Sequence, residues 1–175
     1  RPLNERLIND IEKEMSISVS EDRSFTKNDS GWQSRYDMEK TYNSFREFAS
    51  LLKSVKPNSK RIRTWANVIT DPGGFSRPHR HNLKPMTGVY YPKGLYDIED
   101  LDVFNENDLI QTGWPKGEGQ LVLFDPTAMM RGSNLVVTIE PRESLLLFFP
   151  PWLTHMVAPM ISDTKRYCLS FAIYT

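Results

Sequence analysis

Residues 61–70 read RIRTWANVIT, and from this stretch to the C-terminus the chain is a series of short β-rich runs. β-branched and aromatic residues favour extended strands, and prolines and glycines separate one run from the next. The later runs lie at 87–91, 120–124, 135–139, 145–149, 155–157 and 166–175. Seven short strands separated in this way predict a mainly β fold with two packed sheets, a jelly roll.

The residues before this β-rich half follow a helical period instead. Apolar side chains recur every three or four residues over 2–15 and again over 38–55, where Pro57 ends the series. Residues 16–36 are polar and predict a loop, after which Asp37 can cap the second helix. We therefore expect N-terminal helices packed on the outer face of one sheet.

The length of 175 residues predicts a single domain spanning 1–175. Within it, we expect residues 1–60 to form a helical support and residues 61–175 to form the jelly-roll core. The segment 93–119 interrupts the strands, is acidic in its middle and contains four glycines. It predicts a long loop with one helical turn, of the kind that often carries function.

The charge balance excludes some partners. Lys+Arg and Asp+Glu both number 22, so the formal net charge is zero, and we expect no nucleic-acid binding. The longest apolar run, 145–153, contains two prolines and is too short to cross a membrane. Cys168 is the only cysteine, which excludes an intrachain disulfide and favours a reducing compartment, the cytoplasm.

Histidine occurs only three times, at His79, His81 and His155. If residues 78–82 are extended, the first two side chains leave the same face of the chain and can share one ligand. His155 begins another predicted strand, which a jelly roll can bring alongside. Three neutral imidazoles suit an open metal site that keeps positions for substrate and oxygen. The residues alone equally allow two surface histidines and an unrelated third one in the core.

Four stretches of sequence in the β-rich half resemble one known family. The relevant stretches are NVITDPGGFSRPHRHNLKPMTGVYYPKG (67–94), GQLVLFDP (119–126), EPRESLLLFFPPWLTHMVAP (140–159) and RYCLSFAIY (166–174). Their order resembles that of the iron(II) and 2-oxoglutarate-dependent oxygenases, in the prolyl-hydroxylase-like branch with small bacterial and phage members. Gly31-Trp32-Gln33-Ser34 is also similar to the family's upstream segment.

The resemblance implies a double-stranded β-helix, the cupin-like form of the jelly roll, and an Fe(II) site. His79 and His155 would be two metal ligands. Most of the superfamily has a carboxylate two residues after the first histidine, and this chain has His81 there, which we take as the third ligand. Asp71 or water could instead complete the coordination sphere of the metal. The all-nitrogen set also suits Ni(II), Zn(II) and Cu(II), and ascorbate is a candidate reductant.

The resemblance also implies 2-oxoglutarate as cosubstrate, whose distal carboxylate needs a planar two-donor partner. Arg166 can supply it, because the other residues of its predicted strand face, Cys168, Ser170 and Ala172, are small. The other expected cosubstrate contacts are Tyr91, Thr87, Asn67 and Cys168.

Two arginines beside the histidines are expected to be exposed. If the segment is extended, Arg80 points away from the imidazoles and Arg77 can share their face.

The implied function is a dioxygenase that hydroxylates an amino-acid or peptidyl substrate, with a prolyl residue as one candidate. Its partner would then be a small molecule or a peptide. Two other functions remain open from the sequence. One is a cupin-like three-histidine metal dioxygenase that does not use 2-oxoglutarate, and the other is a jelly-roll binding module without enzymatic activity.

Overall fold

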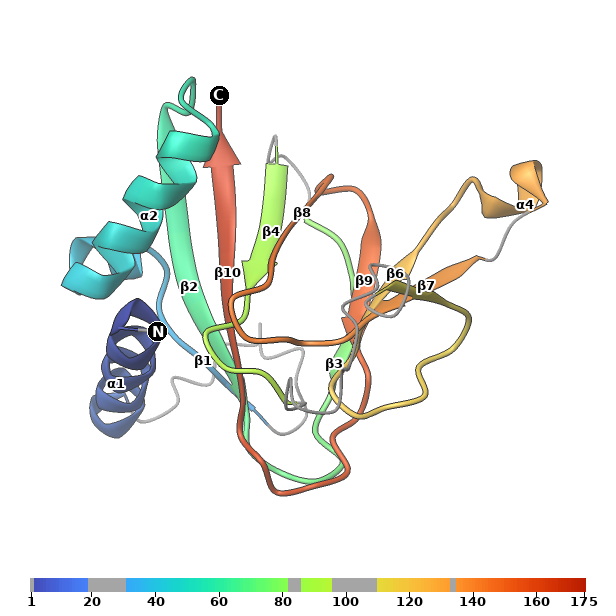
Figure 1. Ribbon diagram of the computed structural model, residues 1–175, viewed down its shortest axis with the longest axis horizontal. Helices are drawn as coiled ribbons and strands as arrows, with labels where there is room; N and C mark the ends of the chain where they lie inside the picture. The colour runs from blue at the N-terminus through green and yellow to red at the C-terminus, as the bar shows by residue number, and fades with distance from the viewer. Residues whose placement is uncertain (1, 19–30, 82–85, 96–109, 133–134) are drawn as a thin grey trace.

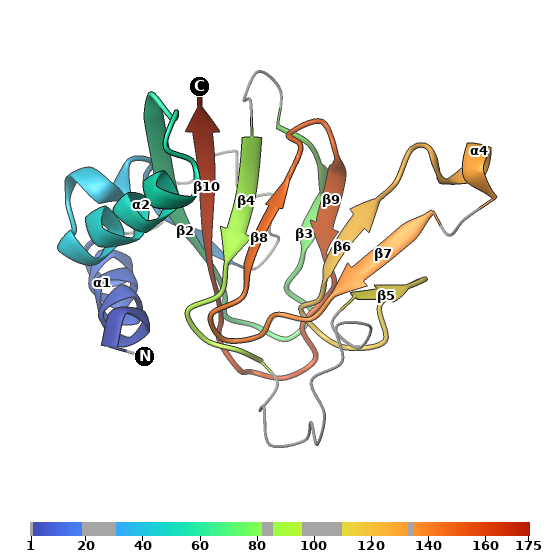
Figure 2. The ribbon, with the colours of Figure 1, turned by 45° about the horizontal axis from the view of Figure 1, so that its top comes forward.

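The computed structural model describes residues 2–18, 31–81, 86–95, 110–132 and 135–175, and these residues form two antiparallel sheets that face one another (Figures 1 and 2). The order of strands in the first sheet is β1 (Trp32–Gln33), β2 (Arg61–Ile69), β10 (Arg166–Tyr174), β4 (Met86–Tyr90) and β8 (Leu146–Phe149). In the second sheet it is β3 (Ser76–His79), β9 (Thr154–Val157), β6 (Leu121–Phe124), β7 (Val136–Ile139) and β5 (Ile110–Thr112). The predicted mainly β, double-stranded β-helix fold is confirmed.

The helical segments are α1 (Pro2–Ile17), the short 3-10 helix η1 (Met38–Lys40), α2 (Asn43–Val55) and α4 (Ala128–Arg131). Helices α1 and α2 cover the outer face of the first sheet, as Figure 1 shows beside β2 and β10. Helix α4 lies at the far end of the molecule, beyond β6 and β7 (Figure 2). The two N-terminal helices predicted from apolar spacing are therefore present, on one sheet.

Strand β10 divides its side chains between the two sides of the first sheet. Leu169 and Phe171 belong to the core that the sheet shares with Leu7 of α1 and Phe45 of α2. Because side chains alternate along a strand, Arg166 and its neighbours at even positions face the second sheet. β10 pairs with β2 without interruption over the length of both strands, which fixes the position of each of these side chains.

The second predicted helix is interrupted after its first turn. Residues 38–40 form η1, and α2 begins at Asn43. Asp37 precedes η1 at a left-handed φ of 63° and makes no side-chain capping bond. Its carboxylate instead accepts hydrogen bonds from Lys40 and from Arg61 and Arg63 of β2, because three cations compete successfully with the backbone N–H groups.

The predicted long loop at 93–119 contains a strand, since residues 110–112 form β5 and pair with β7. Residues 96–109, where a helical turn was expected, lie outside the described residues.

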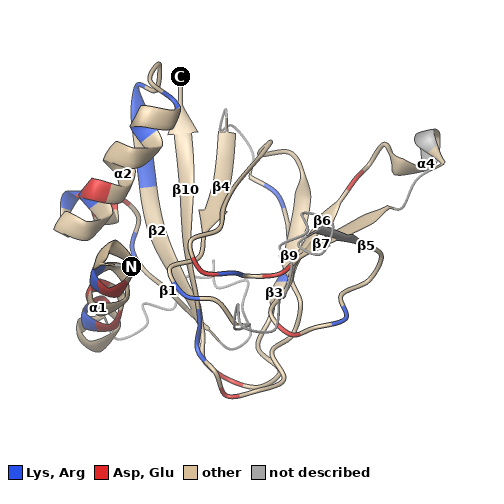
Figure 3. Ribbon diagram, viewed as in Figure 1, with Lys and Arg blue, Asp and Glu red and all other residues tan. Residues whose placement is uncertain are grey.

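Charges of both signs alternate along α1 and α2, whereas the strands are mostly uncharged (Figure 3). None of the helices in the described part of the chain is long and apolar enough to cross a membrane.

Candidate metal and cosubstrate site

The three histidines meet between the two sheets, where each offers a ring nitrogen within 4.8 Å of those of the other two. The ring centroids of His79 and His155 are 4.3 Å apart, and those of His81 and His155 are 5.1 Å apart. Antiparallel pairing sets His79 of β3 opposite His155 of β9. The backbone N–H of His81 donates to the Pro151 carbonyl at 2.8 Å, which holds the third histidine beside them.

Main-chain carbonyls determine the tautomers of two of these rings. His79 Nδ1 lies 2.7 Å from the Arg77 carbonyl oxygen, and His155 Nδ1 lies 2.9 Å from the Leu153 carbonyl oxygen. A carbonyl only accepts, so each Nδ1 carries the proton and donates it. The lone pair is then on Nε2, which is the tautomer a metal ligand needs.

The donor set fits a divalent transition metal. Three neutral imidazoles suit iron, nickel, copper or zinc, and three protein ligands leave positions open for other molecules. His155 is buried, and the other two histidines are half-buried, so the site is reached from one side. Asp71, the alternative third ligand, is exposed, accepts a hydrogen bond from Thr70 and stays outside this cluster.

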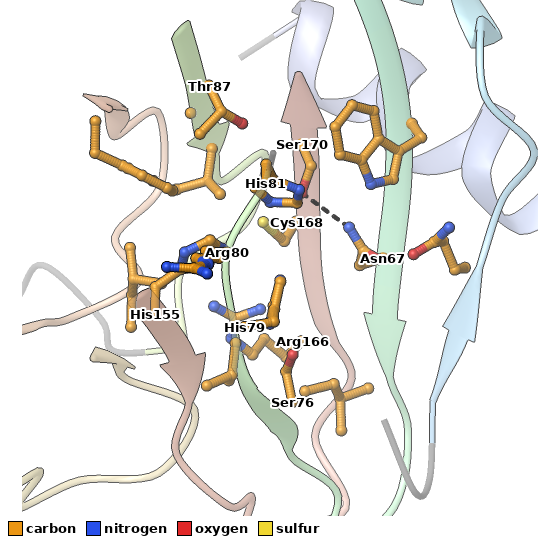
Figure 4. A pocket seen from close by; sticks show the side chains of 18 of the residues that line it. Asn67, Ser76, His79, Arg80, His81, Thr87, His155, Arg166, Cys168 and Ser170 are labelled. Atoms are coloured by element: carbon orange, nitrogen blue, oxygen red, sulfur yellow. Dashed lines mark hydrogen bonds between the residues drawn. The ribbon is translucent and has the colours of Figure 1, made fainter. Parts of the chain in front are cut away.

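A cavity of about 230 Å³ connects the histidines with the inner face of the first sheet. Figure 4 shows the predicted residues around it: Asn67 from β2, Thr87 from β4, and Arg166 and Cys168 from β10. Thr87 donates its hydroxyl to the Phe171 carbonyl at 2.8 Å. Asn67 donates to the Ser170 hydroxyl at 2.9 Å. Burial raises the pKa of the Cys168 thiol, so Cys168 lines the wall as a neutral group.

Arg166 is the most unusual residue of the cavity, because it is a charged side chain that is only 3% exposed. Its Nε donates to the Gly119 carbonyl at 2.8 Å, and Nη2 donates to the Tyr91 hydroxyl at 3.2 Å. Among the described residues, no carboxylate pairs with this guanidinium. Burying a cation without an opposite charge is costly, so this arrangement favours an anionic ligand.

Tyr91 is fully buried beside Arg166, and its ring centroid is 5.1 Å from the guanidinium carbon. Burial raises the pKa of its hydroxyl well above the usual value, and the nearby Arg166 charge only partly opposes this effect. Tyr91 is therefore protonated at neutral pH. Its oxygen accepts from Arg166 while its own proton remains available to a ligand.

The comparison with known families agrees with this geometry. Residues 63–172 match the model of a family described as "Putative 2OG-Fe(II) oxygenase". The chain belongs to this family. It is thus a 2-oxoglutarate-dependent oxygenase, with Fe(II) and 2-oxoglutarate as the family's cofactors. A search of curated protein sequences found no significant match.

Solved structures of similar fold include two prolyl hydroxylases and a protein with nickel and 2-oxoglutarate bound. A prolyl-4-hydroxylase from Pseudomonas putida has a TM-score of 0.66 at 13% identity, covering 99% of this chain and 86% of that one. A prolyl hydroxylase from Trichoplax adhaerens, in complex with a hypoxia inducible factor peptide fragment, has a TM-score of 0.66 at 15% identity, covering 99% and 79%. HygX from Streptomyces hygroscopicus, with nickel and 2-oxoglutarate bound, has a TM-score of 0.65 at 12% identity, covering 99% and 78%. At these identities the likeness concerns the fold.

Three residues of the oxygenase that line the cavity were not among the predicted site residues. Gln33 and Tyr36 come from the segment before η1, and Arg80 lies between two of the histidines. Strict alternation predicted that Arg80 points away from them. β3, however, ends at His79, so Arg80 lies outside the strand to which strict alternation applies. Gln33 belongs to a segment that resembles the family, but no periodic signal linked it to the cavity.

Proposed function

We propose that this oxygenase hydroxylates an amino-acid or peptidyl substrate, with a prolyl residue as the first candidate to test. The observation that carries the proposal is the buried Arg166, which has no carboxylate partner among the described residues and lines the same cavity as the histidine cluster. That combination provides for a metal and for a dianionic cosubstrate in one enclosed space. The substrate would bind at the side of the cavity that the metal and the cosubstrate leave open.

His79, His81 and His155 are the proposed iron ligands. When bound, Fe(II) supplies the activation of dioxygen that couples decarboxylation of 2-oxoglutarate to oxidation of a C–H bond. The chain contributes the orientation of the ligands. The carbonyls of Arg77 and Leu153 keep two imidazoles in the metal-binding tautomer before any metal arrives.

Arg166 and Tyr91 are the proposed partners of the distal carboxylate of 2-oxoglutarate. A guanidinium offers a planar pair of donors and keeps its charge when buried, and the Tyr91 hydroxyl adds a further donor. Thr87, Asn67 and Cys168 would shape the walls around the cosubstrate. They are small or already bonded within the chain, so they leave room and exclude water.

The nature of the substrate is proposed from the resemblance to prolyl hydroxylases. A related fold from Trichoplax adhaerens holds a peptide. HygX, with hygromycin B bound, shows that the same fold also takes a small molecule that is not a peptide. Both a free small molecule and a peptide therefore belong in the first set of substrates to test.

The test is anaerobic reconstitution with Fe(II), followed by calorimetric titration with 2-oxoglutarate. We expect stoichiometric binding that Arg166→Gln weakens by roughly 100-fold, because the substitution removes a buried charge pair. Arg46→Gln, which removes the same charge from the exposed face of α2, is the matched control. Admission of oxygen should then produce succinate, faster with a true substrate from a panel of amino acids and peptides.

Two results would contradict the proposal in different ways. Iron binding and substrate oxidation that Arg166→Ala leaves undiminished would indicate the three-histidine dioxygenase that does not use 2-oxoglutarate. A protein that binds no iron and is unaffected by the double substitution His79→Ala, His155→Ala would indicate a binding module.

A further inference from the structure

The described lining of the cavity is positively charged. It includes two arginines and three histidines, but neither aspartate nor glutamate. In the proposed site, three neutral imidazoles leave the two positive charges of Fe(II) intact, and the two negative charges of 2-oxoglutarate offset them. The charges of Arg166 and Arg80 then remain, and only Arg166 is used by the cosubstrate. Such a field favours a second anion.

Arg80 is the cation that could bind this second anion. It lines the cavity beside the histidines, as Figure 4 shows, and the residue is exposed. Its neighbours in sequence, His79 and His81, are the proposed iron ligands, so a group held by Arg80 lies close to the reacting centre. The structure gives its guanidinium no hydrogen bond or ion pair with any residue in the described ranges.

Gln33 provides a second, independent indication. Its Nε2 is buried and finds no acceptor among the described residues, and Gln33 lines the same cavity. A buried amide donor left without an acceptor costs free energy that a ligand can recover. This amide is thus suited to a neutral acceptor such as a carbonyl oxygen.

Two aromatic rings connect the metal cluster to this side of the cavity. The Trp65 ring centroid lies 6.2 Å from that of His81, and the Tyr36 ring lies 5.1 Å from Trp65 in an edge-to-face arrangement. Trp65 and Gln33 come from adjacent strands, β2 and β1. The wall is apolar between the two polar groups, which suits an aliphatic part of a substrate.

From these features we propose that the substrate carries a free carboxylate, which Arg80 binds, and a neutral carbonyl, which accepts a hydrogen bond from Gln33. An N-acylated amino acid has both groups, and so does the C-terminal residue of a peptide. A residue inside a peptide lacks the carboxylate. A free amino acid brings an ammonium group for which the described lining has no acidic partner. This inference rests on the proposed function, since it names the substrate class of the same site.

The experiment measures binding rather than turnover. The protein is loaded anaerobically with Fe(II) and 2-oxoglutarate, and is titrated by calorimetry with the N-acetyl derivatives of the common amino acids. Each derivative is paired with its N-acetyl amide, which has the same shape without the charge. For at least one pair we expect the carboxylate to bind roughly tenfold more tightly than the amide.

Variants assign this preference to its residue. Arg80→Gln should lower the affinity of the carboxylate to that of the amide and leave the amide unaffected, while Arg46→Gln should preserve the preference. Gln33→Leu should weaken both members of the pair by a similar factor. Each variant should still bind 2-oxoglutarate stoichiometrically, which distinguishes a local effect from misfolding.

Two outcomes would overturn the inference while leaving the proposed function intact. One is 2-oxoglutarate binding without a carboxylate preference in any pair, and the other is a preference that persists in Arg80→Gln. Failure of the native protein to bind 2-oxoglutarate would instead refute the proposed function, and the inference with it.

Discussion

At the scale of single residues, two adjacent tyrosines serve opposite sides of one sheet. Tyr91 accepts a hydrogen bond from Arg166 and is fully buried beside it, whereas the Tyr90 hydroxyl donates to Asn4 Oδ1 of α1 at 2.6 Å. The sequence predicted this parity, because alternation along 87–91 separates the two side chains. The functional assignment of Tyr91 stays a prediction.

Tyr91→Phe should weaken 2-oxoglutarate binding by roughly tenfold, which corresponds to about 1.4 kcal/mol. The substitution removes an acceptor from a buried guanidinium and a donor from the proposed ligand. Calorimetric titration of the Fe(II) protein measures the effect. Tyr90→Phe is the matched control, and it should lower the melting temperature without changing 2-oxoglutarate affinity. Equal losses of 2-oxoglutarate affinity in both variants would contradict the assigned role.

The histidine cluster could be predicted from the sequence, whereas two other residues of the cavity could not. Their rarity and their i, i+2 spacing were enough to predict the cluster that the structure brings together. The position of Arg80 on the cavity could not be predicted, because the end of β3 at His79 has no sequence signal. Gln33 was not predicted as a cavity residue for a different reason. Its contacts with the cavity come through the pairing of β1 with β2, which is distant in sequence.

At the scale of elements, the strands rich in β-branched, aliphatic or aromatic residues were predictable, and three others were not. β2 and β10 are the longest of the predicted strands, and their predicted bounds agree with the structure within a residue. β1 and β5 have only two and three residues, and β3 contains a proline and no β-branched or aliphatic residue. They form because neighbouring strands offer free backbone groups, which is a property of the folded sheet.

The Glu118 carboxylate links the loop that contacts Arg166 to the loop at residues 161–162. Glu118 accepts hydrogen bonds from the backbone N–H groups of Ile161 and Ser162 at 2.6 and 2.7 Å. The next residue, Gly119, has a left-handed φ of 62° and presents its carbonyl to Arg166. A Cβ at position 119 would lie 2.5 Å from Leu95 Cδ1, 2.9 Å from Met160 Sδ and 3.0 Å from Arg166 Cδ, so the left-handed backbone and the close packing both favour glycine. The two loops therefore help to orient the guanidinium.

Glu118→Gln should lower the free energy of unfolding by about 1–2 kcal/mol at neutral pH, because it replaces charge-assisted hydrogen bonds with neutral ones. Burial raises the pKa of this carboxyl, but the backbone donors of Ser162 and Ile161 outweigh burial and lower it below 4.5. A lowered pKa in the folded state stabilises the protein above the unfolded-state value, and this stabilisation is lost as the pH falls through the folded-state value.

The difference between native protein and Glu118→Gln should therefore shrink below about pH 4.5. Denaturant unfolding at a series of pH values measures it. Glu47→Gln, which removes a surface ion pair with Arg6, is the control and should cost less than about 1 kcal/mol. A difference that is constant down to acid pH would contradict the assigned role of the carboxylate.

At the scale of the whole molecule, the helices and the jelly roll share one core. Leu7 and Ile11 of α1 are completely buried in the same cluster as Leu169 and Phe171 of β10. Removal of the helices would expose this face of the sheet to water. Because the helices and the sheet share this core, we propose that the chain folds as a single domain, which is also what its length predicts.

We therefore expect one cooperative unfolding transition for the whole chain. Far-UV circular dichroism, which follows the helices and strands, should coincide with the fluorescence of Trp65, which lies on the cavity side. Calorimetric and van't Hoff enthalpies should agree. The variant Trp65→Phe identifies which part of the fluorescence signal comes from that residue. Separate transitions for the two signals would contradict a single domain.

The hydrogen bonds that orient His79 and His155 tolerate side-chain substitutions during evolution. In both cases the acceptor is the main-chain carbonyl two positions earlier, so the side chains at 77 and 153 are not the source of the bond. Substitutions there can alter the surroundings of the metal while its ligands remain aligned. The catalytic centre and the selectivity of its entrance are thus separable, and new substrates could be acquired without rebuilding the centre.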